Sequence, residues 1–526
     1  MYYGIDLGTT TTLLAEPIVK GSSFEAKAIK IPQLGKQGNR IEKEILPSYA
    51  YFPEGKEPIV GTYAREAPDV SKSVRAIKRF MGRDIEPYVF NRREYYPSDI
   101  SSLFIEHAIK EAIFKDVDAK VNKLTVTVPA SFTTKQRKDT VAAIQKAFER
   151  TGVKFDENVL ISEPLAALLS YISYDISNGF NKVNIDTRPL VLVYDIGGGT
   201  LDLTLVRLRW INTGNEKNLG NVDFKIEAVG RYNQVGGEDF DERIAEWLLE
   251  KLLEQHVALD LELTWNERVQ VRHQLMMIAE RRKIQFNDEY GEDEDPESGI
   301  ECAYLRGKEY SFDVTLHKKD MLKVLEPLIG QHEGPKNCVT CIDKFLSKNS
   351  RNKEQIDHIL CVGGMSRFLM LREAISQTYN TNILFSKTLA DVAVAQGAAI
   401  YSYMKGRFSH TIQEPRADAY YVKTVDDFTK ILGCNEESRT TKFSTVYDSD
   451  YIDLFIFAGE DCKSDVADSS IYPSLMFQEA TKIPLGSNYP RNTPIKITIS
   501  NIGDNKMPSY EIIVDGKTVH FSEMEV

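Results

Sequence analysis

Two short segments of the chain carry the same residue types in the same order, and their chemistry suits a chain of phosphates. They read IDLGTT at 5–10 and YDIGGGT at 194–200. Glycine has no Cβ, so the backbone N–H groups of such turns can approach phosphate oxygens closely. Threonine hydroxyls supply further donors. The residues that we assign to phosphate binding on this basis are Gly8, Thr9, Thr10, Gly197, Gly198, Gly199 and Thr200.

The aspartates of both segments stand where their strands end. A carboxylate at the position of Asp6 or Asp195 can hold hydrated Mg²⁺ without touching phosphate. Asp202 lies on the strand that returns after the second glycine turn, so we expect it to face the same side as Asp195. Hydrolysis of a bound nucleotide at such a site depends mostly on positioning and charge neutralisation.

Two further residues are candidates for the chemical step. Lys78 lies in the basic run 75–83 and could contact a γ-phosphate and the attacking water. The ordinary alternative for such a run is a solvated helix face. Glu163 precedes Pro164 at the start of an Ala/Leu-rich helix, where proline and a carboxylate are both favoured, and it could orient the water.

The elements that would position these residues occur twice. We expect strands at 2–7 and 190–195, each followed by a glycine turn and a returning strand. Helices are predicted at 98–115, at 134–151 with a cap at Thr133 or Thr134, and at 279–285. The same strand, glycine turn and returning strand occur once near the start of the chain and again after residue 190. This repeat predicts a duplicated α/β fold whose two lobes flank a nucleotide cleft. A chance repeat of two glycine turns is the alternative.

The second half adds two more glycine pairs and then changes character. Gly236-Gly237 opens a long helix with apolar core residues, and a strand at 359–362 ends in Gly363-Gly364. An acidic loop is expected at 291–296. Residues 420–526 alternate as half-buried strands, with a hairpin turn at Asp515-Gly516. We therefore predict lobe I at 1–188, lobe II at 189–404, a linker at 405–419 and an all-β sandwich-like domain at 420–526.

Composition limits the class of protein. The 526 residues carry a formal net charge of −12, which argues against nucleic acid as a partner. We expect no signal peptide, no membrane partner and a cytoplasmic location. Cys338 and Cys341 form a CxxC without a second pair at zinc-site spacing, and in the helix that we expect there they are more often incidental than metal-binding or redox-active.

Taken together, the segments resemble the DnaK-type, seventy-kilodalton heat-shock chaperones over roughly residues 2–403. The matching runs, in order, are GIDLGTT, AIKRFMGR, VTVPASF, LISEPLAALLSY, VYDIGGGTLD, VGGEDFDERI, AERRKI, CVGGMSR and DVAVAQGAA. The glycine hairpins alone would fit any actin-like ATPase or sugar kinase. The AIKR-x-x-GR run, the Glu-Pro helix and GGEDFD are far more specific.

The resemblance implies an actin-like ATPase that binds ATP or ADP with Mg²⁺. It places the phosphates on the first hairpin including Thr11, with Gly198 and Gly199 holding the outer ones. It makes Lys78 the catalytic lysine, with Glu163, Asp195, Thr200 and Asp202 completing the hydrolytic set. Mg²⁺ would lie near Asp6 and Asp195. The remaining nucleotide-binding positions that it implies are Gly236, Gly237, Glu280, Lys283, Asn287, Gly363, Gly364, Arg367 and Asp391.

The family's partners are unfolded polypeptides, J-domain co-chaperones and nucleotide-exchange factors, so the resemblance implies these too. The sequence departs from the family at several places. Asn287 stands for the serine that ends the adenosine helix, and residues 410–416 replace the aspartate-bounded leucine-rich linker. The chain ends soon after its last hairpin, so we expect a short variant without the helical lid. Ile452 aligns with a peptide-pocket position, with an ordinary core residue as the alternative.

Three other functions can be compared with the sequence, and the first fits it best. A nucleotide-switched interaction protein with one dedicated partner fits the altered linker. A small-molecule kinase would not need the chaperone-like lysine and glutamate segments. An actin-like filament former would not need the appended β domain.

Overall fold

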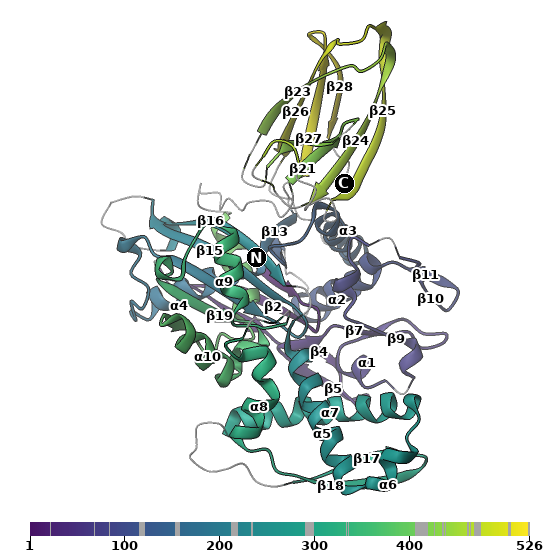
Figure 1. The fold of residues 1–526 in the computed structure, drawn as a ribbon, viewed down its shortest axis with the longest axis vertical. Helices are drawn as coiled ribbons and strands as arrows, with labels where there is room; N and C mark the ends of the chain where they lie inside the picture. Colours follow the sequence, from purple (N-terminus) through teal and green to yellow (C-terminus); the bar gives the residue numbers. More distant parts are fainter. Residues whose placement is uncertain are drawn as a thin grey trace. The chain divides into compact units, whose positions relative to one another are not determined.

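The computed structural model shows the chain as two compact units (Figure 1). The first comprises Met1–Asn181, Ile211–Val229 and Val394–Val526, and the second comprises Lys182–Trp210 and Gly230–Ala393. The predicted domain limits at 188, 404 and 419 stay predictions. The structure describes residues 1–20, 23–67, 69–83, 85–114, 121–152, 158–211, 219–232, 235–289, 299–332, 334, 336–405, 419–425, 427–433, 436, 438–459, 462, 464–467, 475–502 and 507–523. The acidic loop expected at 291–296 and most of the expected linker lie outside these residues.

A mixed sheet forms the centre of the first unit. Its order is β13-β12-β1-β2-β3, with β6 also paired to β2. β1 runs parallel to β12, β12 runs parallel to β13, and β1 and β2 form an antiparallel hairpin. The carboxyl ends of the three parallel strands therefore meet at one edge. The strands are β1 (Tyr2–Leu7), β2 (Thr11–Lys20), β3 (Ser23–Ile29), β6 (Ile45–Pro47), β12 (Lys123–Val128) and β13 (Asn158–Ser162).

Helices pack on this sheet where local signals place them. α3 (Thr134–Thr151) begins after Thr133, whose side chain accepts the Gln136 N–H, as the predicted cap requires. α2 (Pro97–Ala108) is shorter than the helix expected at 98–115, because the chain continues as a π-helical turn at Ile109–Ile113. The other helices of this unit are α1 (Thr62–Arg65), α4 (Glu163–Ser177) and α11 (Ala393–Lys405).

Several short elements complete this part of the first unit. The basic run 75–83 does not form a solvated helix face: it contains a single 3₁₀ turn, Ile77–Phe80, in which Lys78 is buried. The short strands are β4 (Ile31–Leu34), β5 (Arg40–Lys43), β7 (Tyr49–Tyr51), β8 (Ile59–Val60), β9 (Ser73–Arg75), β10 (Tyr88–Phe90) and β11 (Arg93–Tyr95).

The second unit repeats the strand arrangement of the first. β14 and β15 form an antiparallel hairpin, β14 runs parallel to β19, and β19 runs parallel to β20. This is the same order of one hairpin and two added parallel strands, so the expected duplication is present. The strands are β14 (Leu190–Ile196), β15 (Leu201–Trp210), β19 (His358–Val362) and β20 (Asn382–Leu384), and β16 (Val222–Tyr232) divides between the units.

The helices of the second unit include one that the sequence pattern underestimates. α7 runs from Trp265 to Glu289, whereas a helix was expected only at 279–285. Its exposed face carries apolar residues, including Trp265 and Met277, which obscure the helical periodicity. The other elements are α5 (Gly237–Gln255), α6 (Val257–Glu262), α8 (Lys318–Ile329), α9 (Cys341–Lys348), α10 (Leu369–Tyr379), β17 (Gly299–Leu305) and β18 (Lys308–Val314).

The C-terminal strands form a sandwich of two four-stranded sheets around their own apolar core. One sheet has the order β22-β21-β24-β25 and the other β23-β26-β27-β28. The predicted turn at Asp515 and Gly516 joins β27 to β28, both residues having positive φ. The strands are β21 (Ala419–Lys423), β22 (Phe428–Leu432), β23 (Ser438–Ser444), β24 (Ser449–Gly459), β25 (Met476–Tyr489), β26 (Pro494–Ile502), β27 (Met507–Val514) and β28 (Lys517–Glu523).

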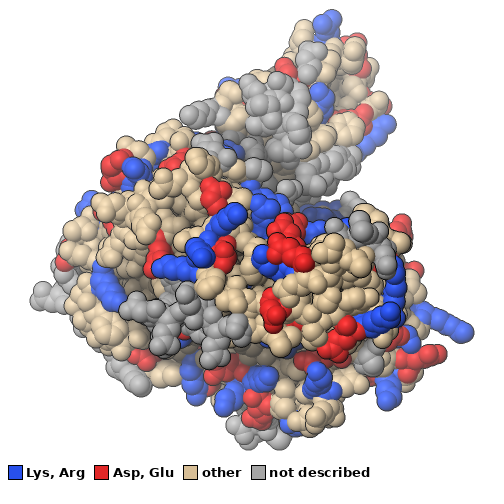
Figure 2. Space-filling view, turned by 60° about the horizontal axis from the view of Figure 1, so that its bottom comes forward, with Lys and Arg blue, Asp and Glu red and all other residues tan. Residues whose placement is uncertain are grey.

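The face of the molecule drawn in Figure 2 carries both signs of charge. Figure 2 shows Lys and Arg side chains interspersed with Asp and Glu over the face that it draws, which is typical of a solvated surface. Among the described helices, none is both long and apolar enough to cross a bilayer.

Candidate functional site

The first glycine hairpin closes through its own backbone. The Gly8 N–H donates to the Thr11 carbonyl at 2.9 Å, between the end of β1 and the start of β2. A Cβ at Gly8 would lie only 2.4 Å from that carbonyl oxygen, so the turn requires glycine. Among the described residues, no acceptor is found for the Thr9 or Thr10 N–H. Those two donors are available to an anion.

Ser48 holds the other side of this hairpin. Its N–H donates to the Thr10 carbonyl at 2.8 Å, and its hydroxyl donates to the Gly8 carbonyl at 3.0 Å. A serine hydroxyl has one proton, so the contact with the Thr12 hydroxyl at 3.0 Å makes Thr12 the donor. These bonds engage the Gly8 and Thr10 carbonyls, and Thr9 is half-buried and Thr10 exposed.

Asp6 lies beside the hairpin at the shared edge of the parallel strands. The Thr127 hydroxyl, from β12, donates to its carboxylate at 2.9 Å. Burial raises the pKa of Asp6 and the Glu163 carboxylate raises it further, while Lys78 and the Thr127 hydrogen bond lower it, with a net value of about 6. A bound cation would favour the charged carboxylate.

Lys78 and Glu163 form an ion pair within the same unit. Glu163 is the first residue of α4 and directly follows β13, so it emerges at the same edge as Asp6. The Lys78 ammonium also lies 5.7 Å from the centre of the Phe132 ring. The fold therefore brings Asp6, Thr127, Lys78 and Glu163 together.

The second hairpin repeats the first. The Gly197 N–H donates to the Thr200 carbonyl at 3.0 Å. Asp195 and Asp202 are directly opposite in the register of β14 and β15, so their side chains point to the same face. Asp202 is only 5% exposed.

The N-terminus of α5 donates hydrogen bonds to carbonyls of the second hairpin, as Ser48 does to carbonyls of the first. The Gly237 N–H donates to the Gly197 carbonyl at 2.9 Å, and the Glu238 N–H donates to the Gly198 carbonyl at 2.7 Å. These are donors that a helix leaves unpaired in its first turn. A Cβ at Gly236 would lie 2.5 Å from the Gly199 nitrogen, which explains the glycine there.

Three of the predicted nucleotide-binding residues share one face of α7. Glu280 is exposed, whereas Lys283 is buried 2.7 Å from the Asp241 carboxylate and 3.3 Å from the Gly237 carbonyl. Burial raises the pKa of Asp241 to about 6 against the opposing effect of Lys283. Asn287 accepts the Leu369 N–H at 2.8 Å, so its amide oxygen is used at the start of α10.

The turn after β19 contains three more of the predicted nucleotide-binding residues, Gly363, Gly364 and Arg367. Gly363 has φ +83°, and a Cβ there would meet the Ile196 carbonyl at 2.4 Å and the Asp195 carboxylate at 2.7 Å. Gly364 is exposed beside it. Arg367 binds Asp391 through two parallel contacts, Nε to Oδ1 at 3.0 Å and Nη2 to Oδ2 at 2.5 Å. The pair fixes the plane of the guanidinium.

The carboxylates beside the glycine hairpins suit hydrated Mg²⁺ better than a metal ion whose ligands all come from the protein. Among the described residues, no group of three or more His, Cys, Asp or Glu side chains could hold an ion. Mg²⁺ commonly takes one or two carboxylates and fills its other positions with water and phosphate oxygens. Asp6 in the first unit and Asp195 in the second each place one carboxylate beside a glycine hairpin, and one carboxylate of either kind would fit that pattern.

Comparison with known proteins identifies the family. The family model described as Hsp70 protein matches residues 86–408, more than half of the chain. The chain belongs to the Hsp70 family. It is 29% identical over 404 residues to a chaperone protein DnaK of Thermosipho melanesiensis and 28% identical over 405 residues to that of Thermotoga neapolitana. Each match covers 76% of this chain and 58% of the relative, so it spans little more than half of the relative's length.

Membership in the Hsp70 family accounts for the architecture described above. The two related sheets, one in each unit, belong to the duplicated actin-like fold, and the β-sandwich follows them in the sequence. The Hsp70 match ends at residue 408, before the sandwich begins. The roles of the individual site residues remain predictions.

Sequence reasoning missed three residues that shape the site. Ser48 belongs to none of the motifs found in the sequence, and Thr127 lay in a matching motif without an assigned role. Asp241, in the GGEDFD run, was not connected with Lys283. Each acts through a partner distant in sequence, so only the motif context could have drawn attention to it.

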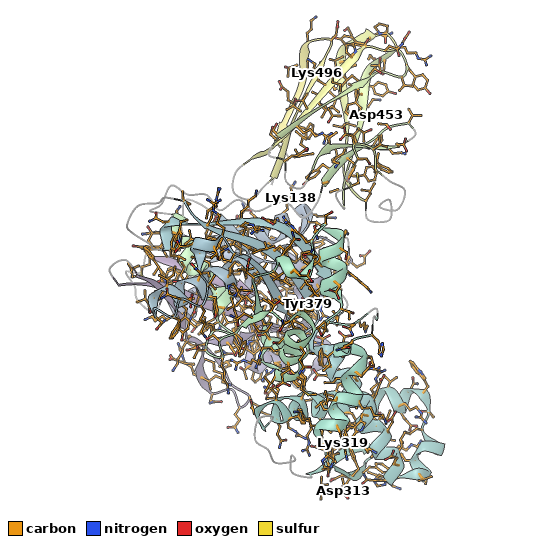
Figure 3. All side chains as sticks on the ribbon, turned by 60° about the vertical axis from the view of Figure 1, so that its left-hand side comes forward. Lys138, Asp313, Lys319, Tyr379, Asp453 and Lys496 are labelled. Carbon is orange, nitrogen blue, oxygen red and sulfur yellow. The ribbon has the colours of Figure 1, made fainter. Side chains whose placement is uncertain are left out.

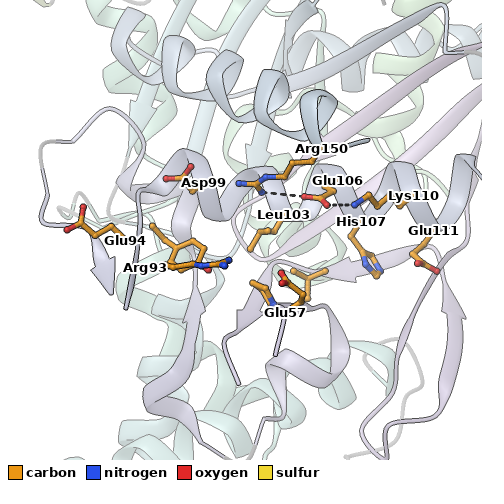
Figure 4. A pocket seen from close by; sticks show the side chains of 13 residues that line it. Glu57, Arg93, Glu94, Asp99, Leu103, Glu106, His107, Lys110, Glu111 and Arg150 are labelled. Carbon is orange, nitrogen blue, oxygen red and sulfur yellow. Dashed lines mark hydrogen bonds and ion pairs between the residues drawn. The ribbon is translucent and has the colours of Figure 1, made fainter. Parts of the chain in front are cut away.

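Two other features lie apart from these residues. A pocket of about 580 Å³ beside α2 is lined by charges of both signs, among which Glu106 pairs with both Lys110 and Arg150 (Figure 4). Cys338 precedes α9 instead of sharing a helix with Cys341, which corrects the expected setting of the CxxC. Both thiols are buried and form no disulfide.

Proposed function

We propose that this Hsp70 family member binds ATP and ADP with Mg²⁺ and hydrolyses ATP, each unit contributing one phosphate-binding hairpin. The observation that carries the proposal is the shared construction of the two hairpins. In both, a glycine N–H closes the turn on a threonine carbonyl, and residues from outside the hairpin donate to two of its other carbonyls. Such a loop presents N–H donors, which suits phosphate oxygens.

The chemical step is assigned to charges near the first hairpin. In this proposal Lys78 contacts the γ-phosphate and the attacking water, and Glu163 orients that water. Asp6 and Asp195 hold the hydrated metal, while Thr200 and Asp202 complete the set on the second hairpin. The metal, when bound, neutralises phosphate charge. The ion pair of Lys78 with Glu163 supports the assignment because it holds both groups in defined positions.

Adenosine is assigned to the second unit. Glu280, Lys283 and Asn287 would contact it from α7, and Gly364, Arg367 and Asp391 from the other side. A guanidinium whose plane is fixed by two contacts is well suited to stack on a purine ring. The engagement of Asn287 with Leu369 leaves its amide NH₂ as the donor for a ligand.

We further propose that the C-terminal sandwich binds unfolded polypeptide or a client protein under control of the nucleotide. An exposed aromatic face supports this: Tyr451 and Phe455 of β24 are 38% and 41% exposed, whereas Leu454 and Ile456 lie in the core. Ile452 packs against that core, which favours its interpretation as a core residue over a pocket residue. A J-domain co-chaperone and a nucleotide-exchange factor are the partners expected of the family.

A second candidate function is a nucleotide-switched interaction protein with one dedicated partner. The sequence HTIQEPR at 410–416, in place of the family's leucine-rich linker, favours it. The two functions differ in how many polypeptides the sandwich accepts. A panel of unrelated unfolded polypeptides separates them, because a chaperone binds many and a dedicated switch binds almost none.

The nucleotide assignment is tested by titrating ATP and ADP into the full chain by calorimetry and by measuring phosphate release, with Mg²⁺ and with EDTA. We expect binding and slow turnover that depend on Mg²⁺. Gly236→Ala, which forces a Cβ against the second hairpin, should weaken ATP binding at least tenfold. A parent chain that binds neither nucleotide would overturn the proposal.

The client assignment is tested by fluorescence anisotropy of labelled, unstructured peptides with and without ATP. Peptide affinity should differ between the two conditions. Equal affinity in both would leave a peptide-binding domain without nucleotide control and contradict the coupling.

A further inference from the structure

The start of α3 and the segment before it pack around the turn that contains Lys78. This 3₁₀ turn, Ile77–Phe80, ends at Met81, whose N–H donates to the Lys78 carbonyl at 3.4 Å. The ring of Phe132, two residues before α3 begins, has its centre 5.7 Å from the Lys78 ammonium. A contact that holds this turn against α3 therefore bears directly on where the Lys78 side chain lies.

Gly82 follows the turn and lies against α3. It has φ +72°, a conformation that favours glycine, and a Cβ there would lie 2.6 Å from the Gln136 Cγ and 2.9 Å from the Gln136 nitrogen. The backbone after Lys78 can approach α3 this closely only because no side chain stands between them. The approach brings the Gly82 N–H within reach of the side chains of α3.

One carboxylate of α3 accepts this N–H. Asp139, half-buried in the second turn of α3, binds the Gly82 N–H through Oδ2 at 2.7 Å. Helical side chains lean toward the helix N-terminus, which directs Asp139 to the end of α3 where the turn lies. Figure 3 labels Lys138, the residue directly before Asp139 on α3. Within the described part of the chain no cation pairs with the Asp139 carboxylate, so the bond to Gly82 is the contact that accounts for it.

We infer that Asp139 is a positioning residue for ATP hydrolysis: by holding Gly82, it fixes the turn that carries Lys78 and thereby the place of the ammonium. The inference rests on the proposed role of Lys78 at the γ-phosphate. Asp139 itself would touch neither the nucleotide nor the attacking water. A hydrogen bond to a charged acceptor is about twice as strong as a neutral one, which suits a contact that must keep a turn in one place.

The ordinary alternative is that Asp139 only stabilises the fold through this hydrogen bond. Its loss would then lower the free energy of unfolding and leave the rate constant of the folded chain unchanged. A positioning role instead lowers the rate constant, leaves nucleotide affinity almost unchanged and disappears when the Lys78 ammonium is absent.

The test measures single-turnover phosphate release and calorimetric ATP binding in the full chain with Mg²⁺. In Asp139→Ala we expect the rate constant to fall about tenfold and the affinity to change by less than about twofold, because a small displacement of a reacting group is costly mainly in the chemical step. Asp139→Asn keeps a side-chain oxygen that can accept the Gly82 N–H, so its rate constant should stay within about threefold of the parent.

Asp357→Ala is the matched control. Asp357 accepts the Leu190 N–H through Oδ2, also at 2.7 Å, at the start of β14 and so at the end of that strand opposite to the second glycine hairpin. Because the variant removes an equal bond, thermal unfolding should show a similar loss of stability. Its rate constant for hydrolysis should stay at the parent value.

A double-mutant cycle with Lys78 tests the path of the effect. If Asp139 acts through the ammonium, Asp139→Ala should lower the rate constant by less than about twofold once Lys78 has been replaced by alanine. An undiminished tenfold loss in that background would show that Asp139 acts on another group, and the inference would be wrong.

The inference is also overturned if Asp139→Ala hydrolyses ATP at the parent rate, if Asp139→Asn is as slow as Asp139→Ala, or if Asp357→Ala loses as much activity. Each of these results leaves the proposed ATPase intact as long as Lys78→Ala is slow. A parent-like rate in Lys78→Ala would instead overturn the assignment of Lys78, and the inference with it.

Discussion

Lys78 and Glu163 form an ion pair that is almost removed from solvent, with 6% and 16% of their side chains exposed. They come from a 3₁₀ turn and from the start of a helix, far apart in sequence. Removing one member of a buried pair leaves the other charge uncompensated, which costs about 3–5 kcal/mol in typical cases. The pair is therefore both a candidate for chemistry and a structural constraint, and experiments must separate these roles.

Lys78→Ala should lower the rate constant for ATP hydrolysis about 100-fold or more while nucleotide affinity changes only a few-fold. The reason is that the ammonium is proposed to act on the γ-phosphate and water, where charge develops during the reaction. Single-turnover phosphate release and calorimetric ATP binding give the two quantities. Lys110→Ala is the matched control, because it also removes a lysine paired with a glutamate in this unit.

A parent-like rate in Lys78→Ala would show that the catalytic assignment is wrong. Thermal unfolding of both variants reports the structural cost. The double variant Lys78→Ala/Glu163→Gln should recover part of any lost stability but none of the activity.

Ser48→Ala should weaken ATP binding about fivefold, because it frees the Gly8 carbonyl that the Ser48 hydroxyl holds at 3.0 Å. The backbone bond from Ser48 to Thr10 remains. Ser48→Thr restores a hydroxyl and should recover most of the affinity. Ser101→Ala, which removes another buried hydroxyl of this unit, should leave ATP binding unchanged. Equal losses in Ser48→Ala and Ser101→Ala would mean that only general packing had been disturbed.

Asp241 should make the stability of the chain fall as the pH rises between about 4 and 6. Its pKa of about 6 in the folded chain exceeds the ordinary 3.8, so the folded chain holds this proton more tightly than the unfolded chain does. The stabilising contribution is therefore complete at low pH and is lost as the pH rises through the folded pKa. A shift of this size corresponds to about 3 kcal/mol.

The measurement compares urea unfolding of the parent and of Asp241→Asn from pH 4.5 to 8. The stability of the parent relative to the variant should decline with pH and level off above about 7. A relative stability that instead grows with pH would show that the ion pair with Lys283 outweighs the burial of Asp241.

The thiols of Cys338, Cys341 and Cys361 should resist alkylation in the folded chain. Burial raises the pKa of Cys341 and that of Cys361 to about 12, so almost no thiolate is present near neutral pH. With iodoacetamide at pH 8, the partly exposed Cys302 should react at least about tenfold faster, as measured by mass spectrometry of each peptide. Comparable rates at all four cysteines would contradict the buried setting, and urea should abolish the difference.

Local sequence signals predicted much of the fold. The cap at Thr133, the turn at Asp515-Gly516 and both glycine hairpins were found where expected, because each depends on a few neighbouring residues and on allowed backbone angles. Predictions based on periodicity fared less well. The helix at 279–285 proved to be only part of α7, since exposed apolar side chains disguise its solvent face.

The sequence by itself determined that the chain has two glycine hairpins, a duplicated α/β fold, a β domain and the motifs of one family. Those properties follow from residue types at short spacing. Only the tertiary structure decided that Ser48 holds the first hairpin, that α5 holds the second, and that the Lys482 ammonium lies over the Tyr451 ring. The physical reason is that a hydrogen bond or an ion pair forms between whichever groups the packed chain brings within reach, and separation in sequence does not limit that choice.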